Sequence, residues 1–146
     1  MNSKELQLVN YEQAKRLKKF GFDWECDKLY VGKQCVRAGT EYFPLERDVD
    51  TYSNWNDVGY EWNDGVQKEW ISAPTVALAF KWFRDEKDIL CEVAWNAPIF
   101  ETKKYTYTGL GKRKDDFANT IVTETFDTYE SAESALLDEL LDLIQN

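Results

Sequence analysis

The segment from Asp48 to Trp70 constrains the fold more than any other part of the chain. It reads DVDTYSNWNDVGYEWNDGVQKEW and places large aromatic residues among Asn, Asp and Gly, with neither helix nor strand spacing. The sequence therefore predicts a long loop at 48–70, with regular elements before and after it. Loops of this length in compact domains are either functional or held in place by their own side chains.

This predicted loop has two interpretations. Trp and Tyr supply rigid contact area while Asn, Asp and Gly supply adaptable hydrogen bonds, a composition that is typical of recognition surfaces. On the other interpretation, the aromatic side chains turn back and pack on the core. If the loop is a recognition surface, its candidate binding residues are Tyr52, Trp55, Asp57, Tyr60, Trp62 and Trp70.

Length and composition predict one folded domain over residues 1–146. A chain of this length with 43 % hydrophobic residues can bury a full core. It contains no run of about 18 apolar residues, as a membrane span needs, and the polar start MNSKELQLVN does not resemble a signal peptide. We therefore expect a cytoplasmic protein that does not enter a membrane.

The residue types present exclude much familiar chemistry. The chain has no histidine, which removes the commonest general base and metal ligand. Cys26, Cys35 and Cys91 are scattered, so the sequence predicts buried free thiols instead of a disulfide framework or a zinc site. Neither a phosphate-binding loop at 109–112 nor a calcium loop in 48–70 has the required spacing. We predict no metal, no cofactor and no catalytic residue.

Charge divides the chain unevenly. Residues 1–37 carry eight Lys/Arg and five Asp/Glu, a net charge of +3, whereas residues 38–146 carry 10 and 22, a net charge of −12. This acidic balance makes nucleic acid an improbable partner, because affinity for phosphates comes mainly from cationic side chains. It is compatible with a protein partner.

The N-terminal region predicts a short helix followed by a hairpin. Asn10 and Gln13 stand at the positions of a capping box, and Gly21 is placed to end the helix. The last turns are crowded with basic residues, which form either a solvated face or a site for an anionic partner; they are Lys15, Arg16, Lys18 and Lys19. Two short strands, 27–31 and 34–38, are predicted next, joined by a tight turn.

The second half of the chain predicts two more helices and three strands. Ser72 with Pro74 indicates the start of an apolar helix. Strands follow at 89–95, 100–108 and 119–126, and short connections favour an antiparallel meander. The fold class is therefore α+β, a mainly antiparallel sheet with three helices packed on it, in the order α-β-β-loop-α-β-β-β-α.

Thr128 is a candidate cap for the last helix, 129–144, which carries two apolar edges. One small sheet needs only one such edge, so the second is either buried within the chain or covered by another subunit. We predict a homodimer, with an interface that contains Leu137, Leu141 and Ile144.

Three segments of the chain carry a further pattern, and they are NYEQAKRLKKFGFDWECD, SAPTVALAFKWFRDEK and FDTYESAESALLDELLDLI. Together they resemble a group of small proteins encoded by phages and prophages of gut anaerobic bacteria. In that group a short helix ending in Gly-Phe, a Ser-x-Pro helix and a Phe-x-Thr-x-Glu-x-Ala helix occur in the same order. The resemblance implies a mobile-element protein, and it transfers neither an activity nor functional residues.

The sequence favours an accessory protein that binds a protein partner through the loop at 48–70. An alternative is a carbohydrate-active enzyme, which needs two carboxylates and aromatic platforms but no histidine. Its candidate acids are Asp57, Glu61, Asp64 and Glu69. A further alternative is an acidic decoy that mimics nucleic acid toward a basic protein.

Overall fold

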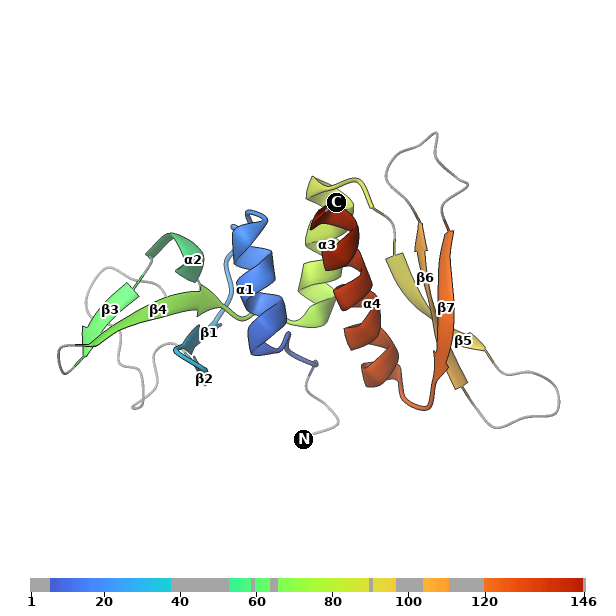
Figure 1. Cartoon of the computed structure of the whole chain (residues 1–146), viewed down its shortest axis with the longest axis horizontal. Helices are drawn as coiled ribbons and strands as arrows, with labels where there is room; N and C mark the ends of the chain where they lie inside the picture. Colours follow the sequence, from blue (N-terminus) through green and yellow to red (C-terminus); the bar gives the residue numbers. More distant parts are fainter. Residues whose placement is uncertain are drawn as a thin grey trace. The chain divides into compact units, whose positions relative to one another are not determined.

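The computed structural model describes residues 6–37, 53–58, 60–63, 66–89, 91–96, 104–110 and 120–145. The chain divides into two compact units, residues 8–75 and residues 76–146 together with the first seven residues. The α+β class is confirmed: helices accompany antiparallel sheets (Figure 1). The described residues form two sheets, one in each unit, where the sequence predicts a single sheet.

The first helix, α1 (Tyr11–Lys19), begins and ends where the sequence predicts. The Asn10 side chain accepts a hydrogen bond from the N–H of Gln13 at 2.8 Å, and the Gln13 side chain accepts one from the N–H of Asn10 at 2.9 Å. These two bonds form the expected capping box. Gly21 has a φ of 95°, and the N–H of Phe22 donates back into the last turn at 2.9 Å, so the helix ends in a Schellman motif.

Four antiparallel strands form the sheet of the 8–75 unit, in the spatial order β2-β1-β4-β3. Their bounds are β1 (Lys28–Val31), β2 (Gln34–Arg37), β3 (Tyr60–Asn63) and β4 (Val66–Ser72). The predicted hairpin of β1 and β2 is confirmed, with Gly32 at a φ of 59° in its turn. β4 pairs with β1 so that Trp70 lies opposite Val31 and Ser72 lies opposite Leu29.

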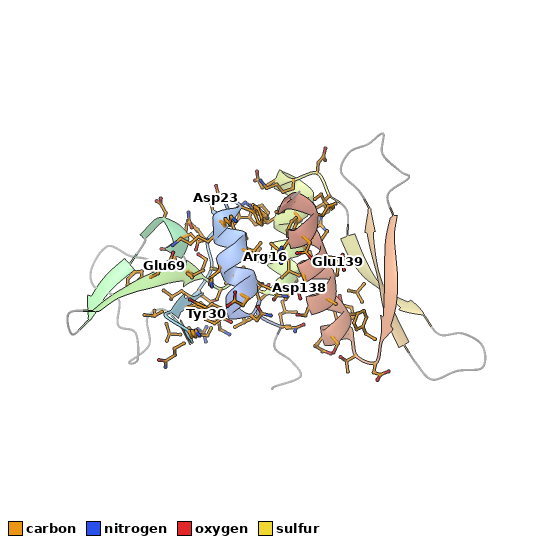
Figure 2. All side chains as sticks on the ribbon, viewed as in Figure 1. Arg16, Asp23, Tyr30, Glu69, Asp138 and Glu139 are labelled. Carbon is orange, nitrogen blue, oxygen red and sulfur yellow. The ribbon has the colours of Figure 1, made fainter. Side chains whose placement is uncertain are left out.

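Tyr30 joins this sheet to the segment around α1. Its hydroxyl donates to the Val9 carbonyl at 2.7 Å, and its ring meets the Tyr11 ring edge-on with the centroids 5.6 Å apart. Figure 2 labels Tyr30 beside α1. Apolar side chains from the helix, the strands and the connecting segments complete the core of the unit. They include Val9, Ala14, Leu17, Phe22, Leu29, Trp55, Ile71 and Ala73.

The segment 48–70 is more regular than the sequence predicts. It contains a one-turn helix, α2 (Trp55–Val58), and the hairpin of β3 and β4, while residues 48–52, 59, 64 and 65 lie outside the described residues. The helix α2 raises the number of described helices to four, against the three predicted. The loop prediction fails because hydrogen bonds to distant β1 hold β4 in place, and spacing within the segment does not show them.

The helix α3 (Val76–Glu86) starts later than Ser72 and Pro74 predict. Ser72 is the last residue of β4, where it pairs with Leu29 and its N–H donates to the Asn56 side chain at 2.9 Å. These contacts hold it in a strand, so it does not cap the helix. One face of α3 is buried through Val76, Ala79, Phe80, Trp82 and Phe83.

The predicted meander near the C-terminus is confirmed. It consists of β5 (Cys91–Asn96), β6 (Lys104–Leu110) and β7 (Thr120–Phe126), antiparallel and in that order. The helix α4 (Tyr129–Gln145) follows and lies against this sheet and against α3 (Figure 1). Thr128 caps α4 as predicted, since its hydroxyl accepts from the N–H of Ser131 at 3.1 Å. No helix in the described part of the chain is long and apolar enough to cross a membrane.

Candidate functional site

Two of the predicted binding residues, Trp55 and Trp70, pack inside the 8–75 unit. Trp55 is fully buried, and its indole N–H donates to the Cys26 carbonyl at 2.7 Å. The rings of Trp55 and Trp70 meet edge-on with the centroids 5.9 Å apart, and Trp70 is half-buried. The expectation that Trp55 lies on a recognition surface is therefore wrong, because tertiary contacts draw its ring into the core.

The other predicted binding residues give little support to a recognition surface on the segment 48–70. Asp57 is exposed on α2. Tyr60 and Trp62 lie on β3, and their side chains lie outside the description, as does the whole of Tyr52. Among the described residues, the segment therefore supplies packing more than contact surface.

Asn56 shows how α2 is held. Its side-chain amide donates to the Phe22 carbonyl at 2.9 Å and accepts from the N–H of Ser72 at the same distance. The Ser72 hydroxyl in turn accepts from the N–H of Asn56 at 3.3 Å. This ring of hydrogen bonds fastens α2 to the end of β4, so the Asn in this segment also has a structural role.

The cysteines differ from one another. Cys26 is buried as predicted, and burial raises the pKa of its thiol to about 11. Cys35 lies exposed on β2, which corrects the prediction that it is buried, and the Cys91 side chain lies outside the description. β2 is an edge strand among the described residues, so its side chains have strand neighbours on one side only, and Gln34, Cys35 and Arg37 are all exposed.

The predicted interface on α4 is mostly internal. Leu137 and Leu141 are fully buried within the chain, and Ile144 is half-buried. The first two therefore offer no exposed apolar edge, because α4 packs against both α3 and the three-stranded sheet. The homodimer itself stays a prediction.

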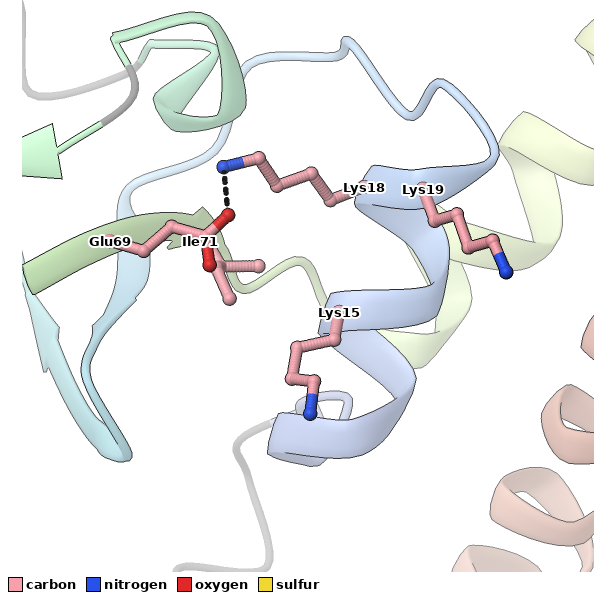
Figure 3. Close-up of a pocket in the computed structure, with 5 residues that line it drawn as sticks. All are labelled: Lys15, Lys18, Lys19, Glu69 and Ile71. Atoms are coloured by element: carbon pink, nitrogen blue, oxygen red, sulfur yellow. Dashed lines mark hydrogen bonds and ion pairs between the residues drawn. The ribbon is translucent and has the colours of Figure 1, made fainter.

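The structure instead shows a basic hollow between α1 and β4, both in the 8–75 unit (Figure 3). It has a volume of about 400 Å³, and we call it the lysine hollow. Residues three and four apart share a helix face, so Lys15 lies near both Lys18 and Lys19, while these two adjacent lysines diverge from each other (Figure 3). The lining residues are Lys15, Lys18, Lys19, Glu69 and Ile71.

One ion pair crosses the lysine hollow from helix to sheet. Lys18 Nζ lies 2.6 Å from Glu69 Oε1 and donates to the Trp70 carbonyl at 3.2 Å (Figure 3). Lys15 Nζ lies 3.4 Å from Glu12 on its own helix and 5.1 Å from the centre of the Tyr11 ring. Exposed pairs of this kind contribute about 0–1 kcal/mol, so the lysines can exchange these partners for others.

The sequence analysis identifies several residues of this hollow as candidates, but it does not predict that they lie close together. It offers the lysines as a candidate site for an anionic partner and Glu69 as a candidate acid of an enzyme. Their meeting depends on how β4 packs beside α1, which no local pattern shows. Among the described residues, no group of three or more Cys, Asp or Glu could hold a metal ion.

Comparisons with known proteins return no match: no family model matches, and no curated protein or solved structure is detectably similar. A function for this chain therefore has to be inferred from its own fold and from the contacts of its described residues.

Proposed function

We propose that the chain acts by binding a protein partner through the lysine hollow. The observation that carries the proposal is that three lysines of α1 line a hollow beside β4, on a chain whose net charge is −9. Such a local reversal of charge favours encounter with a partner of opposite charge and fixes its orientation. A cytoplasmic setting and a role as an accessory protein of a phage or prophage belong to the same proposal.

A capture experiment with matched variants tests this proposal. The full chain is immobilised as wild type, as Lys15→Glu and as Lys33→Glu, and each is exposed to cell lysate with and without nuclease treatment. Lys33 is an exposed residue in the turn between β1 and β2, so its variant makes the same charge change in the same unit but outside the hollow. We expect a protein that wild type and Lys33→Glu retain and that Lys15→Glu loses.

Two outcomes contradict the proposal. One is a set of retained proteins that is the same for all three baits, or empty. The other is retention that depends on the lysine hollow but disappears with nuclease treatment, because the partner would then be a nucleic acid.

A further inference from the structure

Glu69 is a carboxylate of the chain itself that lies in the lysine hollow. It reaches Lys18 from β4, the side of the hollow opposite α1, at 2.6 Å. Lys15 and Lys19 extend away from this pair (Figure 3). The hollow thus combines one lysine occupied by an internal carboxylate with two lysines that point elsewhere.

The pair is open to exchange. The Glu69 side chain is 58 % exposed, and that of Lys18 is 24 % exposed, so water and ligands reach the carboxylate. An ion pair in this setting gains little from its own attraction, because water screens it and two long side chains must be held still. An incoming carboxylate can therefore replace Glu69 without a large loss of stability.

Resting on the proposed function, we infer that the partner presents an acidic peptide segment to the lysine hollow and that Glu69 competes with the partner's carboxylates for Lys18. The lysine side chains that line the hollow carry long apolar stems beneath their charged ends. A segment that alternates acidic and apolar side chains fits both properties. A nucleic acid fits less well, because its phosphate backbone has no apolar side chains to pack on the lysine stems.

Fluorescence anisotropy with a labelled peptide of alternating Glu and Leu tests this inference. Titration with the full chain compares wild type, Lys15→Glu, Lys33→Glu and Glu69→Gln. We expect Lys15→Glu to weaken binding about tenfold and Lys33→Glu to change it less than about twofold. Glu69→Gln is expected to strengthen binding by about two- to fivefold, since the competing charge is gone while the side-chain size is kept.

Matched probes decide between this inference and its rivals. A peptide with Gln in place of Glu should not bind. Equal binding of an oligothymidylate would show a surface for any polyanion and overturn the inference, as would unchanged or weaker binding by Glu69→Gln.

Light scattering that shows the wild-type chain pairing with itself through Lys15 would identify the occupant as a second copy and also overturn it. If a protein captured through the hollow is not displaced by the Glu-Leu peptide, the proposed function stands and the inference fails.

Discussion

At the scale of one residue, Trp55 is a predicted surface residue that packs in the core instead. Its ring is fully buried, contacts Trp70 edge-on and donates a hydrogen bond to the Cys26 carbonyl. We expect Trp55→Ala to lower the free energy of unfolding by about 3–5 kcal/mol, the usual loss for a buried aromatic residue. Denaturant melts of the variant and of wild type measure the difference.

Asp57→Ala supplies the control for this prediction, because Asp57 is exposed on the same turn of helix. Surface substitutions of this kind change the free energy of unfolding by about 0.5 kcal/mol or less. A loss of less than about 1 kcal/mol for Trp55→Ala would mean that the ring does not belong to the core.

Glu133 on α4 is a buried carboxyl group with a perturbed pKa. Burial raises its pKa above the ordinary value of 4.5, the charge of Glu130 raises it further, and a hydrogen bond with Tyr129 opposes them. When the oxygen and nitrogen of the Gln7 side-chain amide are exchanged, which satisfies both atoms, the nitrogen donates to Glu133 Oε1 at 3.2 Å. The folded state therefore keeps the proton of Glu133 at a pH where the unfolded chain has lost it.

The sign of the pH dependence follows from this shift. The stabilising contribution of Glu133 is complete below the ordinary pKa and is lost as the pH rises through the folded pKa. We expect the free energy of unfolding of Glu133→Gln, taken relative to wild type, to be higher at about pH 7 than at about pH 4. The reason is that the amide cannot ionise. Denaturant melts at both pH values test this. A stability difference that does not change with pH would show that Glu133 titrates normally in the folded state.

At the scale of elements, the sequence predicts the helix ends and turns that interactions between neighbouring residues determine. The capping box of Asn10 and Gln13 and the left-handed Gly21 lie within a few residues of α1, so the sequence contains the whole cause of both helix ends. The hairpin of β1 and β2 is local in the same sense. Ser72 carries an equally good cap signal, but pairing with distant Leu29 keeps it in β4.

At the scale of the whole molecule, the sequence could not predict the sites because distant segments build them. The lysine hollow needs Glu69 of β4 beside Lys18, which is 51 positions earlier in the chain. The division into two sheets likewise depends on β4 pairing with β1 instead of joining the later meander. Spacing along α1 indicates a shared face for the lysines, but it does not indicate what lies opposite that face.

The burial of α4 leads to a prediction about the association of whole chains. Leu141 is fully buried, and α4 packs against α3 and the three-stranded sheet. We expect Leu141→Glu to unfold its surroundings, with a loss of about 4–5 kcal/mol or more, because a charge would enter an apolar core. Circular dichroism and denaturant melts of the variant and of wild type measure this loss.

Light scattering on the same variant separates burial within one chain from burial between two. The predicted homodimer would have about twice the chain mass of 17.1 kDa. If wild type is such a dimer and Leu141→Glu is a folded monomer, Leu141 lies between subunits and its burial within the chain is contradicted. If wild type stays monomeric and the variant loses its fold, both apolar edges of α4 belong to one core, because no second chain is then present to cover either edge.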